Sequence, residues 1–189
     1  PTWLRRQRQM CIRDSFEALL SNTATPSSTS NTVHENVHIP VSVSVCSNIP
    51  GAQQPKCFVS SGDPQALVNE MMQYCNTLAT RAGLLMRRKF KKYTKVLDRK
   101  SSKFQKDDNP FQKASIDLHQ WLNTVSLFGF NSGKYDLNMA KKYLIPYLNQ
   151  QDKPKYLIKR NHTYLSISLQ NLHLLDISNF CAAGYSYAD

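Results

Sequence analysis

The sequence predicts an α/β or α+β domain built around a mixed β-sheet, and three patterns support this. Apolar residues alternate with serine in one segment. In a second segment, a helix-start signal is followed by apolar residues at helical spacing. Further on, short apolar strands alternate with helical segments. The chain has 189 residues, enough for one ordinary domain with a sizeable core. The expected order is strand, hairpin, helix, helix, strand, helix and hairpin.

The first fifteen residues, PTWLRRQRQMCIRDS, are interpreted as non-native. They start with basic residues, but the apolar segment of a signal peptide does not follow them. They closely resemble translated sequencing adapter, which occurs at the ends of assembled environmental sequences. We therefore divide the chain into residues 1–15, which are left out of fold reasoning, and a domain over residues 16–189. We expect this domain to be cut again after the terminal GYSYAD.

The first part of that domain predicts a loop and a hairpin. Residues 21–32 are small and polar, as in a surface loop. In HIPVSVSVCSN, Val41, Val43 and Val45 alternate with serine, which predicts a strand with one buried face. IPGAQQP is typical of a turn, and KCFVS of the returning strand.

A long amphipathic helix is expected next. Asp63 and Pro64 are typical of a helix N-cap and of the first helical position. Apolar residues then recur at helical spacing from Leu67 and Met71 as far as Leu97, which predicts a helix packed on the sheet. Further on, PFQKASIDLHQWLNTV predicts a helix and SLFGF predicts a strand. DLNMAKKYLIPYL predicts another helix. KYLIKR and YLSISLQ together predict a hairpin, which LHLLDISNF follows.

The positive charge is concentrated in one segment. The formal net charge is +11, and between Arg81 and Lys106 eleven Lys or Arg residues stand against one acid, Asp98. This distribution favours a polyanion such as nucleic acid or an anionic membrane surface, and a solvated helix face explains it equally well. No apolar run approaches the ~18 residues needed to cross a bilayer, so we expect no membrane partner. Five cysteines without a CxxC pair suit an intracellular, reducing compartment.

A polar, glycine-containing break follows the predicted strand SLFGF. A phosphate-binding loop is rejected, because the Gly129 to Gly133 spacing is one residue too short and Tyr135 replaces the required hydroxyl residue. A plain strand-to-helix connection capped by Asp136 stays open. So does a metal-dependent nuclease site, in which Asp136 binds Mg²⁺ or Mn²⁺, Tyr135 stacks on a base and Asn131 holds the strand.

The segment FGFNSGKYDLNMAKKYL resembles the second exonuclease motif, Asn-x(2–3)-Phe/Tyr-Asp, of family B DNA polymerases of the protein-primed viral, organellar and mobile-element type. HIPVSVSVCSNIPGAQQPKCFVSSGDPQALVNEMM and LHLLDISNFCAAGYSYAD resemble stretches of virus-like and transposon-borne members. The similarity covers about Phe16 to Asp189. It implies a 3′–5′ proofreading exonuclease domain with a ribonuclease H-like fold, a mixed sheet flanked by helices that is incomplete at both ends. The whole protein would be a DNA-directed DNA polymerase that acts in DNA replication.

The resemblance also implies roles for individual residues. Glu17 and Asp136 would be the catalytic metal ligands, for two Mg²⁺ or Mn²⁺ ions in the intact domain. The expected DNA ligands are Asn131, Lys134, Tyr135, Asp176 and Ser178, and an Asp176 that caps a strand end is an equally good interpretation. The implied partners are a single-stranded DNA 3′ end, primer–template DNA and a terminal priming protein.

Two expected carboxylates are missing from their motifs. The first motif of the family is Asp-x-Glu, and Ser15 stands where its Asp should be. Asp14 cannot replace it, because positions three apart on a strand face opposite sides. A match of Tyr185 and Asp189 to the third motif, Tyr-x-x-x-Asp, is interpreted as coincidence. We therefore expect the chain as written to be inactive or nearly so. The alternative is a non-catalytic nucleic-acid-binding module that uses the basic segment.

Overall fold

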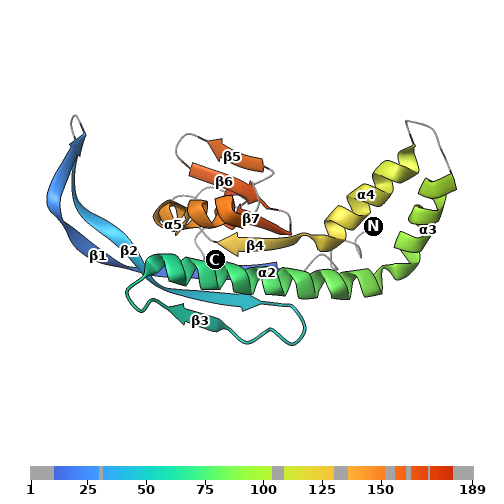
Figure 1. Ribbon diagram of the computed structural model, residues 1–189, viewed down its shortest axis with the longest axis horizontal. Coiled ribbons are helices and arrows are strands. Elements are labelled where there is room, and N and C mark those ends of the chain that lie inside the picture. The colour runs from blue at the N-terminus through green and yellow to red at the C-terminus, as the bar shows by residue number, and fades with distance from the viewer. Residues whose placement is uncertain are drawn as a thin grey trace.

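The structure, a computed structural model, describes residues 11–29, 32–103, 109–129, 136–151, 156–160, 163–169 and 171–180. Its strands are β1 (Cys11–Thr29), β2 (Thr32–Ser47), β3 (Lys56–Val59), β4 (Val125–Gly129), β5 (Tyr156–Arg160), β6 (Thr163–Ser168) and β7 (Leu172–Asp176). Its helices are α2 (Pro64–Lys89), α3 (Lys91–Lys103), α4 (Pro110–Asn123), α5 (Asp136–Gln151) and the short 3-10 helix η1 (Ile177–Phe180). The α/β class predicted from the sequence is confirmed (Figure 1).

One seven-stranded mixed sheet forms the centre of the molecule, in the order β3-β2-β1-β4-β7-β6-β5. The three central strands β1, β4 and β7 run parallel to one another. The outer strands pair antiparallel, β2 and β3 on one side and β6 and β5 on the other. Since parallel strands end at the same edge of a sheet, Gly129 and Asp176, the last residues of β4 and β7, lie in register there.

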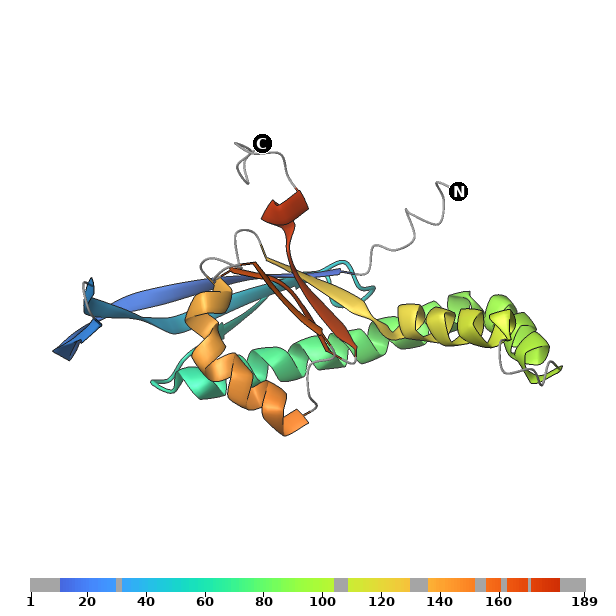
Figure 2. The ribbon, with the colours of Figure 1, turned by 90° about the horizontal axis from the view of Figure 1, so that it is seen from above.

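Helices α2 and α5 cover the same face of the sheet (Figure 2). Their apolar residues share one core with the buried positions of the strands, among them Val43 and Val45 of β2 and Leu127 of β4. The alternation read from the sequence is confirmed at Val43 and Val45, each 1% exposed, with the exposed Ser44 between them. In the described ranges, no helix is long and apolar enough to span a membrane.

The helix starts follow local side-chain chemistry. The Asp63 carboxylate accepts a hydrogen bond from the Gln65 backbone N–H at 2.8 Å, and Pro64 is the first residue of α2, as predicted. Helix α4 begins with a similar N-cap, in which the Asn109 side chain accepts a hydrogen bond from the backbone N–H of Phe111 at 3.0 Å.

Two expectations about element boundaries are wrong. Residues 21–32 were expected to form a loop, but β1 and β2 continue through most of this segment as a two-stranded ribbon, with a register shift between Asn22 and Ser27. Backbone pairing here outweighs the polar composition. The expected single helix as far as Leu97 is divided at Phe90 into α2 and α3. Phe90 is the C-cap of α2, and its ring packs edge-to-face on Trp121 with centroids 5.4 Å apart.

The end of α2 continues with α3 and α4 into a projection that we call the helical arm, defined as residues 87–103 and 110–123. Both views show it extending beyond the end of the sheet (Figures 1 and 2). A small second core of Met86, Phe90 and Leu122, with Leu118 and Trp121 packed against it, lies at its base. The arm therefore has apolar packing separate from the main core.

Candidate active site at the carboxylate edge

Three acidic residues lie at the edge of the sheet where the parallel strands end. Asp176 is the last residue of β7, and Asp136 is the first residue of α5, the helix that follows β4 along the chain. Glu17 lies on β1 beyond Arg13, which pairs with Phe128 near the end of β4. We call Glu17, Asp136 and Asp176 the carboxylate edge. Acidic groups at this end of a parallel sheet occupy the usual position of a binding site in α/β proteins.

The three acids interact electrostatically at Asp136. Burial, followed by the negative charges of Asp176 and then Glu17, raises the pKa of the Asp136 carboxyl group to about 6. The N-terminus of α5 favours an anion at this position, but burial and the two neighbouring charges outweigh it. A raised carboxyl pKa next to other acids is typical of functional sites and is relieved when a cation binds.

Asp176 is held firmly at the end of its strand. It is 1% exposed, and its Oδ1 accepts hydrogen bonds from the backbone N–H of Ser178 at 3.0 Å and from the Ser178 hydroxyl at 2.7 Å. These contacts are those expected of an acid that caps a strand end. Sequence reasoning gave Asp176 a DNA-contact role and missed its position beside Asp136. The apolar strand segment LHLLD, which ends in Asp176, was the available signal.

Glu17 is exposed and lies on the opposite face of β1 from its buried neighbour Phe16. The pairing with β2 runs without a shift from Ile12 to Glu17 and is irregular only after Glu17. Positions 15 and 17 therefore share one face of the strand, and position 14 belongs to the other. That Ser15, not Asp14, takes the place of the missing first-motif Asp stays a prediction.

Other predicted site residues fall outside the described ranges. These are Asn131, Lys134, Tyr135, Tyr185 and Asp189. The segment expected to be non-native is described in part, because Cys11–Ser15 belong to β1 and Cys11, Ile12 and Arg13 pair with β4. That the first fifteen residues are non-native stays a prediction.

The donor atoms at the carboxylate edge are of the kind that Mg²⁺ prefers. Within the described part of the chain, no three His, Cys, Asp or Glu side chains lie close enough together to hold a metal ion. Mg²⁺ in phosphoryl-transfer sites is usually bound by one or two carboxylates, with waters and substrate phosphates as the remaining ligands. Glu17 and Asp136 supply two carboxylates, the number that such a site requires.

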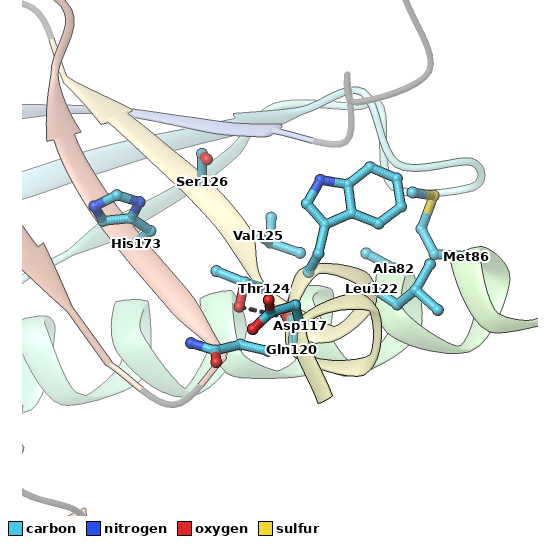
Figure 3. Close-up of a pocket in the computed structure, with 10 residues that line it drawn as sticks. Ala82, Met86, Asp117, Gln120, Leu122, Thr124, Val125, Ser126 and His173 are labelled. Atoms are coloured by element: carbon cyan, nitrogen blue, oxygen red, sulfur yellow. Dashed lines mark hydrogen bonds between the residues drawn. The ribbon is translucent and has the colours of Figure 1, made fainter. Parts of the chain in front are cut away.

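A cavity of about 530 Å³ lies away from these acids, between α2, α4 and the starts of β4 and β7. Val125 and Ser126 of β4 and His173 of β7 line it, together with Asp117 and Gln120 of α4 (Figure 3). The carboxylate edge lies at the opposite ends of the same strands. This cavity is therefore separate from the candidate active site.

The comparisons with known proteins give no match: no family model, no curated protein and no solved structure is similar to the chain. The function is therefore argued from the residues and their arrangement.

Proposed function

We propose that the chain is the 3′–5′ exonuclease region of a family B DNA polymerase, with a ribonuclease H-like fold. The observation that carries this proposal is the carboxylate edge, where burial and then the charges of Asp176 and Glu17 raise the pKa of Asp136. A sheet with three parallel central strands and antiparallel outer strands is compatible with such a domain. The sequence motif around Asp136 supplies the second, independent support.

In this proposal Glu17 and Asp136 hold one or two Mg²⁺ or Mn²⁺ ions. When bound, such ions help form the attacking hydroxide and stabilise the charge on the leaving oxygen during phosphodiester hydrolysis. Asp136 can bind a cation well only when ionised. Because its pKa is about 6, the proposed activity falls as the pH drops below that value.

The remaining residues would position the DNA 3′ end. Asn131, Lys134 and Tyr135 are proposed to contact the terminal nucleotides through hydrogen bonds, charge and stacking. Asp176 is too deeply buried for direct contact in this conformation, so we propose that it orients Ser178, which lies half-exposed at the same edge. The proposed partners of the whole protein are primer–template DNA and a terminal priming protein.

Ser15 provides the sharpest test of this function. We expect the chain as written to hydrolyse single-stranded DNA weakly or not at all, because Ser15 replaces a metal-binding Asp. Ser15→Asp places a carboxylate on the same face of β1 as Glu17 and should raise Mg²⁺-dependent release of 3′ nucleotides at least about tenfold, equivalent to about 1.4 kcal/mol.

The controls separate a restored site from a general effect. Ser15→Asn has a similar size without the charge and should give no gain, and Asp136→Ala in the Ser15→Asp background should abolish the gain. A Ser15→Asp protein that folds normally but shows no Mg²⁺-dependent release of 3′ nucleotides would contradict the proposal. Strong digestion by the unaltered chain that Asp136→Ala abolishes would instead support the site and refute the expected inactivity.

A further inference from the structure

The helical arm presents a row of cations on a fixed support. Phe90 at its base is 5% exposed and lies edge-to-face on Trp121 of α4, with ring centroids 5.4 Å apart. Between α3 and α4, the Asn109 side chain donates to the Ser101 carbonyl oxygen at 3.0 Å, and the Lys100 ammonium lies 5.1 Å from the Phe111 ring centroid. These contacts hold α3 against α4, so the outer surface of α3 keeps its orientation.

Most side chains on that outer surface are basic. Exposed cations include Arg87, Arg88 and Lys89 at the end of α2 and Lys91, Lys95 and Arg99 on α3. The last three are spaced four residues apart, so they form one row with steps of about 6 Å along the helix axis. Their mutual repulsion is unfavourable in the free protein and would be relieved by a polyanion.

The only acid between Arg81 and Lys106 does not balance this row. The Asp98 carboxylate accepts a hydrogen bond from the Ser115 hydroxyl of α4 at 2.5 Å and lies 3.2 Å from the His119 Nε2. The Asp98 carboxylate therefore takes part in the contact between α3 and α4. The sequence shows one acid among eleven cations, and the structure adds that this acid is hydrogen-bonded to α4.

We propose that the outer surface of the helical arm binds the sugar–phosphate backbone of duplex DNA, at a site separate from the carboxylate edge. The arm precedes the start of β4 and the carboxylate edge follows its end, so a strand of about 16 Å lies between the two. Duplex DNA is favoured because it carries one negative charge per about 1.7 Å, a density that suits a closely spaced row of cations.

A lipid surface fits the arm less well. A helix that lies on a membrane buries an apolar face in the lipid, whereas α3 carries exposed cations and contacts α4 through Asp98 and Lys100. The proposal does not depend on the exonuclease function, because phosphate contacts by the arm require neither a metal ion nor Glu17 and Asp136.

The test measures binding of the full chain to a fluorescent 20-base-pair duplex in EDTA, by anisotropy, over a range of salt concentrations. Each lost phosphate contact lowers the slope of log affinity against log salt by about 0.9. The double variant Lys95→Gln/Arg99→Gln should therefore lower the slope by about 1.8, and its affinity at 0.1 M salt should fall roughly 50-fold.

The matched control removes the same charge from the sheet. Lys56 on β3 and Lys159 on β5 are exposed and lie on the two edge strands, so Lys56→Gln/Lys159→Gln should leave the slope within about 0.5 of the parent. The charge-keeping variant Lys95→Arg/Arg99→Lys should bind like the parent. Circular dichroism and thermal unfolding establish that each variant is folded.

Several outcomes would overturn the proposal. Equal loss of slope in the arm and sheet variants would mean non-specific attraction by net charge. Binding to vesicles rich in phosphatidylserine without binding to the duplex would assign the arm to a membrane surface. Binding that Asp136→Asn abolishes in EDTA would place the contact at the carboxylate edge.

Discussion

Asp176, the last residue of β7, lies in register with Gly129, the last residue of β4, and is 1% exposed there. The chain that leaves β4 re-enters the described structure at Asp136, whose pKa responds to the charge of Asp176. The parallel pairing of β4 with β7 therefore brings together two acids that are far apart in the sequence.

Replacing Asp176 should lower the pKa of Asp136. Burial is the largest cause of the raised value and the Asp176 charge is the next, so Asp176→Asn removes the second cause and leaves the first. The Asn side-chain oxygen can still accept the hydrogen bonds from Ser178. Carboxyl-carbon NMR titration should show Asp136 ionising below pH 6. Glu17→Gln should give a smaller decrease, and an unchanged Asp136 titration in Asp176→Asn would contradict the proximity of the two acids.

The stability of the chain should fall between about pH 4 and pH 6 through Asp136. The pKa of this carboxyl group is raised from its ordinary 3.8 to about 6, so the folded protein binds more protons than the unfolded chain in this window. The free energy of unfolding therefore decreases as the pH rises through it. Asp136→Asn removes this decrease and should be more stable than the parent at pH 7. Urea unfolding at pH 4, 5, 6 and 7 measures the difference.

Asp98 provides a control of opposite sign for the same experiment. Hydrogen bonds from Ser115 and then His119 lower the pKa of Asp98, so its contribution to stability is present above the ordinary value of 3.8 and is lost as the pH falls. Asp98→Asn should therefore be less stable than the parent at pH 7, with a difference that shrinks in acid. If both variants changed stability in the same direction at pH 7, the electrostatic explanation for Asp136 would be wrong.

Local signals predicted the parts of the fold that depend on neighbouring residues. The period-two valines of β2 and the Asp63–Pro64 start of α2 were both correct, because each reflects a contact within a few residues. The end of α2 at Phe90 was missed, and there Phe90 packs against Trp121 of another helix, a contact that no local spacing shows. For residues 21–32 the polar composition predicted a loop, but most of the segment belongs to the paired strands β1 and β2.

The candidate site could be predicted only in part, for a similar reason. Glu17 and Asp136 were selected by motif resemblance, and both lie at the carboxylate edge. The place of Asp176 depends on which strand pairs with β4. The strand that pairs with β4 is β7, although α5, β5 and β6 lie between them in the chain. Such non-local pairing leaves no signature in a short segment.

The N-cap of α2 should contribute about 1 kcal/mol to stability. Asp63→Ala removes the acceptor for the Gln65 backbone N–H, and losing an N-cap of this kind typically costs about 0.5–2 kcal/mol. Because α2 carries many residues of the main core, the loss should appear in the global free energy of unfolding in urea. Asp63→Asn keeps a side-chain acceptor and should cost little. Equal destabilisation by both variants would show that charge, not the cap, matters at this position.

The helical arm should lose its packing when Phe90 is truncated, while the sheet keeps its own. Phe90→Ala removes the edge-to-face contact with Trp121 and the buried ring beside Met86 and Leu122, and truncation of a buried Phe typically costs about 3–5 kcal/mol. Hydrogen exchange should accelerate in α3 and α4 and stay slow in β2, because the arm core is separate from the main core. Tyr93→Ala is the matched control, since this ring is 57% exposed and its loss should cost less than about 1 kcal/mol. Uniformly faster exchange across β2 and the arm in Phe90→Ala would show that the two cores unfold as one unit.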